Sequence, residues 1–188
     1  LQRMAVATGG DHLALLAGGG TIRVWNLLRG SQGRPIAAGK DVVFAPSADG
    51  TLLILGGASG GIELRDARTG ASVGSLASKN GAITKLATST DSLQLIVGTR
   101  SGQIEIWDLA ARKLLAAGKA ADAPITAITA GAQALVGSAD GAVTVVDIAS
   151  GAAKAIAKVA GPVTDLKIGA DGKQAGVAAV RRDWPMAK

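Results

Sequence analysis

The stretch "SGQIEIWD", from Ser101 to Asp108, alternates polar and apolar residues and ends in Trp-Asp. Alternation with a period of two is the pattern of a half-buried β-strand. The pattern recurs three more times: "GTIRVWN" ends at Asn26, "GGIELRD" at Asp66 and "GAVTVVD" at Asp147. The chain therefore contains four copies of one predicted strand.

The four copies follow one another at a nearly constant spacing. The slots that hold Trp25, Arg65, Trp107 and Val146 lie 40, 42 and 39 residues apart. A glycine stands five residues before each slot, at positions 20, 60, 102 and 141. Fixed periods in this range are typical of repeat architectures, so the sequence predicts one supersecondary unit copied about every 40 residues.

Each unit contains four short segments with strand character, separated by turn residues. In the third unit we expect strands at about 83–87, 93–98, 103–107 and 113–117. The Ala-rich segment "DLAARKLLAAGKAAD", from Asp108 to Asp122, is the best candidate for a helix. We prefer a turn and a fourth strand there, because the segment occupies the same place in the repeat as "ARTGASVGSLAS", residues 67–78.

Units of this length that end in Trp-Asp resemble the WD40-repeat family of β-propellers. The residues that carry the resemblance are Trp107-Asp108, Trp25-Asn26, Asp66 and Asp147. The resemblance implies an all-β propeller of four-stranded antiparallel blades, with four full blades and part of a fifth in this chain. No unit has the family's Gly-His dipeptide, so we expect its buried Asp–His–Ser/Thr–Trp hydrogen-bond network to be absent. Packing and backbone pairing would then hold the propeller together.

The repeat places all 188 residues in one WD40-like propeller portion. The blades are expected at about 4–38, 41–76, 83–117 and 125–159, with a partial blade at 163–184. Since related propellers usually have about seven blades, we expect the remainder to come from absent sequence or another chain. A designed or reduced four-bladed toroid is the alternative.

Composition removes several classes of site. The chain has no cysteine, which excludes disulfides and thiolate zinc sites, and no apolar run approaches the ~18 residues of a membrane-spanning helix. One histidine and two glutamates leave little for acid–base or metal chemistry, so we expect no enzyme, cofactor, metal site or small-molecule substrate. Glu63 and Glu105 are expected on a solvated strand face, and His12 in a turn.

Lysines recur where each unit ends, and they are the main candidates for partner binding. Lys40, Lys79, Lys119 and Lys158 are spaced by 39, 40 and 39 residues, so a propeller would place them in an arc on one rim, with Arg100 on the same face. Such an arc would attract an acidic protein or an RNA backbone. The alternative is that exposed loop ends simply favour lysine. Secondary candidates are Arg181, Arg182 and Trp184, which could stack on bases, although Trp184 also suits the core of a fifth blade.

The function that these patterns favour is a non-enzymatic scaffold that docks proteins in a larger complex. The net charge of +6 makes a ribonucleoprotein assembly, such as one of ribosome biogenesis, a plausible setting by analogy with the family. We expect an intracellular location, either cytoplasmic or nuclear and nucleolar. The alternatives are a propeller regulator, such as a small-GTPase exchange factor in membrane trafficking, and a propeller enzyme.

Overall fold

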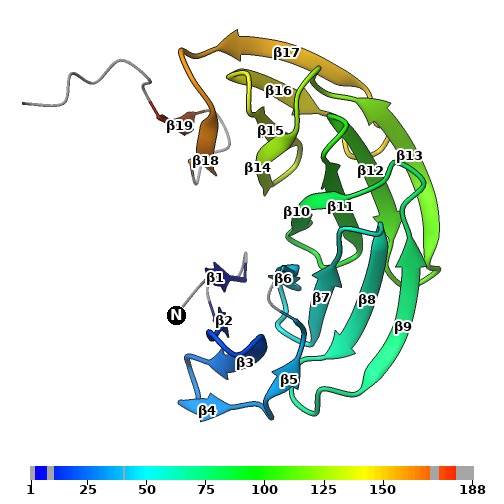
Figure 1. The fold of residues 1–188 in the computed structure, drawn as a ribbon, viewed down its shortest axis with the longest axis vertical. Coiled ribbons are helices and arrows are strands. Elements are labelled where there is room, and N and C mark those ends of the chain that lie inside the picture. The colour runs from blue at the N-terminus through cyan, green and yellow to red at the C-terminus, as the bar shows by residue number, and fades with distance from the viewer. Residues whose placement is uncertain (1–2, 8–10, 40, 170–173, 181–188) are drawn as a thin grey trace, which may run out of the picture.

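The computed structural model describes residues 3–7, 11–39, 41–169 and 174–180. Every secondary-structure element assigned in these residues is a β-strand, which confirms the all-β prediction. Within these ranges no helix has the length and apolarity to cross a membrane. The strands form five antiparallel sheets that fan around a common centre as a β-propeller, and the arc is open on one side (Figure 1).

The sheets follow the repeats. The first contains β1 (Arg3–Val6), β2 (His12–Leu16), β3 (Thr21–Asn26), β4 (Ser31–Gln32) and β5 (Ile36–Ala37). The second contains β6 (Val43–Pro46), β7 (Leu52–Gly56), β8 (Gly61–Asp66) and β9 (Ser72–Ala77). The third contains β10 (Ile83–Thr88), β11 (Gln94–Thr99), β12 (Gln103–Asp108) and β13 (Lys113–Lys119). The fourth contains β14 (Ile125–Ala130), β15 (Ala134–Ser138), β16 (Ala142–Val146) and β17 (Ala153–Lys158), and the fifth β18 (Val163–Ile168) and β19 (Ala175–Ala179).

Each sheet runs from the centre outward in chain order. The innermost strands β1, β6, β10, β14 and β18 face the centre, while β9, β13 and β17 lie on the outer side (Figure 1). The Ala-rich segment forms a turn and β13, as predicted. In the first sheet the outer strand is split into β4 and β5, both paired with β3. Pro35 lies between the two pieces, and proline has no N–H to donate to a sheet.

The apolar core is divided among the junctions between sheets. The described residues form four buried clusters, and each combines residues of two neighbouring sheets. Between the third and fourth sheets, for example, Ile96, Ile104 and Ile106 pack against Val136 and Val146. These five side chains are at most 1% exposed. Because one face of a sheet must be covered by another element, each sheet depends on its neighbour for burial.

The repeated glycine has a specific task in the turn between the second and third strands of each unit. Gly20, Gly60, Gly102 and Gly141 have φ between +76° and +87°, the left-handed region that side chains disfavour. The carbonyl of Gly102 accepts the backbone N–H of Ala120 at 3.0 Å, and that of Gly141 accepts the N–H of Val159 at 2.9 Å. A Cβ on Gly102 would lie 2.1 Å from the carbonyl oxygen of Ala121. The glycine therefore lets the end of the fourth strand approach this turn.

One glutamate does not lie where the sequence suggested. Glu105 was expected on a solvated face, but it is 0% exposed. Its carboxylate accepts hydrogen bonds from Trp107 Nε1 at 2.9 Å, Ser78 Oγ at 2.7 Å and Asn80 Nδ2 at 2.6 Å. Ser78 and Asn80 belong to the connection from the second sheet, so this network joins two blades. The expectation that packing and backbone pairing alone hold the propeller was therefore wrong at this junction.

His12 was expected in a turn, but it is the first residue of β2, and its Nε2 lies 2.9 Å from Nδ2 of Asn26. Its ring also packs against Gly50 of the neighbouring sheet, because a Cβ there would lie 2.1 Å from His12 Nδ1. Glu63 stays partly solvated and forms an ion pair with Arg65 at 2.8 Å.

Replacing Gly102 with alanine should lower the free energy of unfolding by about 2 kcal/mol or more, since the substitution adds left-handed strain and a backbone clash. Gly19→Ala is the matched control, because a Cβ there meets no atom within 4 Å. Urea denaturation followed by circular dichroism measures both. Equal stability of the two variants would contradict the role given to the turn.

Replacing Glu105 with alanine should cost about 3 kcal/mol of stability, because three hydrogen-bond donors lose their acceptor and two of them belong to the connection from the second sheet. Glu63→Ala should cost about 1 kcal/mol or less, since it removes a partly solvated ion pair. Both substitutions remove the same side-chain atoms, so the urea midpoints of the two variants can be compared directly. A smaller loss for Glu105→Ala than for Glu63→Ala would refute the network's contribution.

Candidate interaction surfaces

The lysines predicted to form an arc lie at corresponding ends of the outer strands. Lys119 is the last residue of β13 and Lys158 is the last residue of β17. Lys79 follows β9 by two residues, and all three side chains are exposed. We call these three lysines and Arg100 the basic rim. Lys40, Arg181, Arg182 and Trp184 lie outside the described residues.

Two members of the basic rim meet at one junction. Arg100 lies in the turn between β11 and β12, and its backbone N–H donates to the carbonyl of Ala82 at 2.9 Å. In the same turn, Ser101 Oγ donates to the carbonyl of Asn80 at 3.2 Å. Asn80 directly follows Lys79. The structure therefore brings Lys79 and Arg100 to the boundary between the second and third sheets.

Acidic neighbours compensate the other two rim charges. Lys119 Nζ lies 2.5 Å from Asp122 Oδ1, and Lys158 Nζ lies 3.4 Å from Asp140 Oδ2. Among the described residues, Lys79 and Arg100 have no carboxylate oxygen within 4.0 Å. The net positive charge of the rim is thus concentrated at the Lys79–Arg100 junction.

Asp140 also organises the turn on which it lies. Ser138 Oγ donates a hydrogen bond to Asp140 Oδ1 at 2.5 Å. Ser138 is buried, with 1% of its surface exposed. This hydroxyl lowers the pKa of the Asp140 carboxyl below its ordinary 3.8, and Lys158 adds to the effect against an opposing contribution from burial. The charged carboxylate is therefore part of the folded turn.

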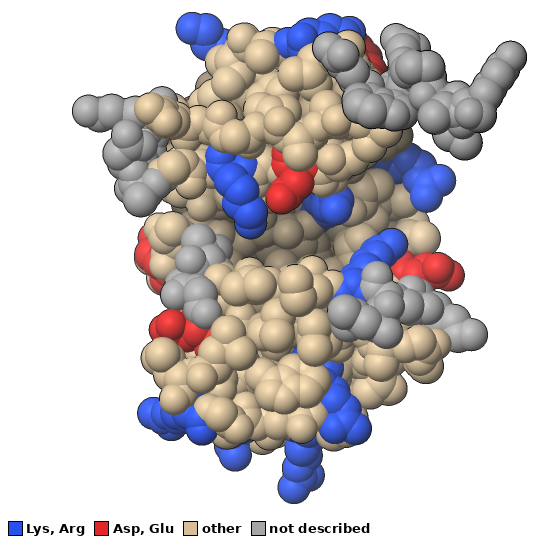
Figure 2. Space-filling view, turned by 90° about the vertical axis from the view of Figure 1, so that its left-hand side faces the viewer, with Lys and Arg blue, Asp and Glu red and all other residues tan. Residues whose placement is uncertain are grey.

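A hollow of about 1270 Å³ opens at the centre of the arc, and sequence reasoning did not identify it. We call it the central hollow; its walls are the innermost strands of all five sheets, β1, β6, β10, β14 and β18. The space-filling view shows basic and acidic side chains at its mouth (Figure 2). The signal in the sequence was a charged residue inside an otherwise uncharged first strand, in "ITKL" at 83–86 and "VTDL" at 163–166.

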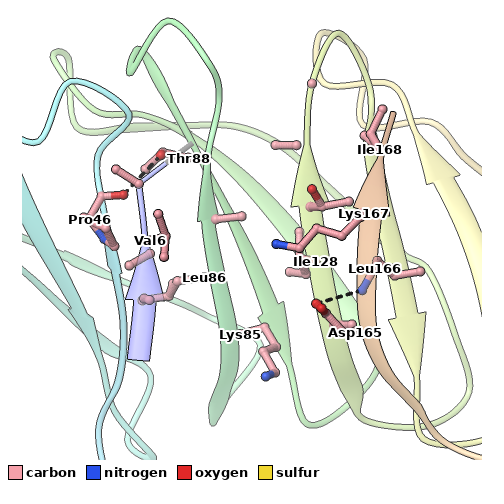
Figure 3. A pocket seen from close by; sticks show the side chains of 18 of the residues that line it. Val6, Pro46, Lys85, Leu86, Thr88, Ile128, Asp165, Leu166, Lys167 and Ile168 are labelled. Atoms are coloured by element: carbon pink, nitrogen blue, oxygen red, sulfur yellow. Dashed lines mark hydrogen bonds between the residues drawn. The ribbon is translucent and has the colours of Figure 1, made fainter. Parts of the chain in front are cut away.

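Four of the described lining residues carry charge: Arg3, Lys85, Asp165 and Lys167. Lys85 and Asp165 occupy equivalent positions, because a register shift lies directly before each of them in β10 and β18. Lys167 and Asp165 extend from β18 in the direction of β10, which carries Lys85 (Figure 3). The described part of the lining therefore has three cations and one carboxylate.

The charges in the central hollow are not paired with one another. No carboxylate oxygen of the described chain lies within 4.0 Å of the cationic nitrogens of Arg3, Lys85 or Lys167. Arg3 Nη1 donates to the carbonyl of Val42 at 3.0 Å, which holds its guanidinium beside β6. Lys85 is open to the hollow, yet burial among the surrounding strands lowers the pKa of its ammonium group. The charge of Arg3 lowers it further, and Asp165 opposes the shift.

In the described part of the chain, no three His, Asp or Glu side chains come together as a metal site. Comparison with known proteins gives one family. Residues 11–170 match the model of the family described as "Nucleolar protein 10-like, N-terminal domain". The match covers well over half of the 188 residues. No curated protein matches the chain.

Acid should weaken the fold through Asp140. Because its pKa is lower in the folded chain than the ordinary 3.8, its stabilising contribution is complete above about pH 4 and is lost as pH falls through the folded value. Asp140→Asn should therefore reduce the dependence of the urea midpoint on pH between about pH 5 and about pH 2. Ser138→Ala should reduce it too, since the hydrogen bond from that hydroxyl is the largest single cause of the lowered pKa. An unchanged slope in both variants would contradict this assignment.

Proposed function

Because the chain belongs to the nucleolar protein 10-like N-terminal domain family, we propose that it is a non-enzymatic interaction module that docks other proteins within a larger assembly. The family match over residues 11–170 is the observation that carries this proposal. The architecture supports it physically. Turns anchored on sheets that share buried cores are held in place before binding, so less conformational entropy is lost when a partner binds.

The setting we propose is a ribonucleoprotein assembly of the nucleus, with ribosome biogenesis as the process. Two features support it: the nucleolar name of the family and the net charge of +6. A positive protein is attracted to the negative backbone of RNA and to acidic proteins over long range, with a strong dependence on salt.

The surface we propose for the first contact is the basic rim, and its centre is the junction of Lys79 and Arg100. These two side chains are exposed and have no carboxylate oxygen within 4.0 Å among the described residues. Lys119 and Lys158 contribute less, because Asp122 and Asp140 compensate them. Partner binding at the rim should therefore depend more on the first pair than on the second.

Sedimentation of the tagged chain from its own cells tests the proposal. We expect the chain in complexes far larger than a protein of 188 residues, with a defined set of proteins crosslinked to it. If the assembly is a ribonucleoprotein, treatment with ribonuclease should shift its sedimentation. Sedimentation as a free monomer, without crosslinked partners, would overturn the interaction function.

The double variant Lys79→Glu/Arg100→Glu should reduce recovery of the partners about tenfold or more at low salt. Lys113→Glu/Lys154→Glu is the matched control, because it reverses two exposed charges on β13 and β17 outside the rim. Equal recovery with both double variants would remove the rim from the proposal but leave the interaction function standing.

A further inference from the structure

Among the described residues, the walls of the central hollow carry more positive than negative charge. Arg3, Lys85 and Lys167 face one carboxylate, Asp165, and none of the three cations forms an ion pair with it. Asp165 Oδ1 instead accepts the backbone N–H of Leu166 at 2.9 Å. Lys85 is open to the hollow, but burial by the surrounding strands and the positive charge of Arg3 both oppose its protonated form in the unbound chain. An anionic group between them would relieve this repulsion.

Apolar side chains stand next to these charges. Met4 and Val6 of β1 are 61% and 52% exposed, and both line the central hollow. Leu86 and Ile128 lie on the facing strands and are half-buried. A ligand that presents only charge would leave this apolar surface in water. A ligand with apolar groups beside its carboxylate would cover it, and each buried CH₂ would add about 0.8 kcal/mol.

The lining is better suited to a peptide than to RNA. Single-stranded RNA is usually held by exposed aromatic rings on which bases stack. Among the described lining residues the aromatic one is Phe44, and it is only 9% exposed. The carboxylate of Asp165 would also repel a continuous phosphate backbone, whereas a peptide can place a polar amide opposite it.

We propose that the central hollow binds an extended segment of a partner protein in which acidic and apolar residues alternate. One carboxylate of the segment lies between Arg3 and Lys85, a second lies near Lys167, and apolar side chains cover Met4 and Val6. This inference deepens the proposed function, since it names the chemistry of one partner, and it uses a surface different from the basic rim.

The experiment uses the purified full chain and a short, capped, fluorescein-labelled peptide in which leucine and aspartate alternate. Fluorescence polarisation measures its binding, and the same peptide with asparagine in place of aspartate is the reference. We expect the acidic peptide to bind at least about tenfold more tightly than the reference, because hydrogen bonds to charged groups contribute about 1.5–3 kcal/mol each. No binding of the acidic peptide, or equal binding of the two, would overturn the inference.

Single substitutions then locate the site. Lys85→Met and Arg3→Met should each weaken binding of the acidic peptide about tenfold, and Asp165→Asn should strengthen it, because a like charge is removed. The control Lys154→Met removes the same charge from β17, which does not line the hollow. If Lys154→Met lost as much affinity for the acidic peptide as Lys85→Met, or if Asp165→Asn did not gain affinity, the peptide would be attracted by net charge alone. Either result would refute the site.

A labelled polyuridine RNA provides the competing outcome. If the RNA displaces the peptide and loses affinity in Lys85→Met, the hollow is an RNA site and the inference is wrong. Because this experiment needs no cellular partner, its failure is separate from a failure of the sedimentation test. If the chain bound the peptide but sedimented alone, the site in the hollow would stand and the proposed assembly would be refuted.

Discussion

Each sheet of the propeller is stable only when the neighbouring sheet covers its apolar face. Most of the buried apolar side chains in the described residues lie in four separate clusters, each shared by two adjacent sheets. Stability in such an arrangement is approximately a sum of nearest-neighbour contributions. The strand β15 is buried at all five positions, whereas its counterpart β19 in the two-stranded fifth sheet is exposed at all five. The second strand of a unit is therefore less buried where its sheet contains no third and fourth strand.

The same constraint produces the two surfaces considered for function. Stacking brings the ends of the outer strands to one side, where they meet the glycine turns, and the basic rim follows from lysine at those ends. Stacking also turns the innermost strands toward a common centre, where Arg3 and Lys85 come near each other although they are distant in sequence. Both surfaces are consequences of repetition, but only the hollow combines uncompensated charge with exposed apolar side chains.

The sequence was sufficient to predict the strands, because alternation and turn glycines are local signals. It predicted the third sheet to within two residues at each boundary and correctly preferred a strand over a helix at Lys113–Lys119. It failed at Glu105, whose partners Ser78 and Asn80 come from the preceding unit and have no local signature. It also missed the hollow, because the repeat gives equivalent positions but not which charges face each other across the centre. The division of the first outer strand could have been predicted from Pro35.

Native-state hydrogen exchange of the backbone amides measures how stability is distributed among the five sheets. If each sheet is stabilised by its neighbours, exchange should be slowest in β11 and β12, which lie in the third sheet with a neighbour on each side, and progressively faster toward β1 and toward β19. Uniform protection across all five sheets would contradict this expectation, because that would indicate one cooperative core. Protection of β19 equal to that of β11 would contradict it as well.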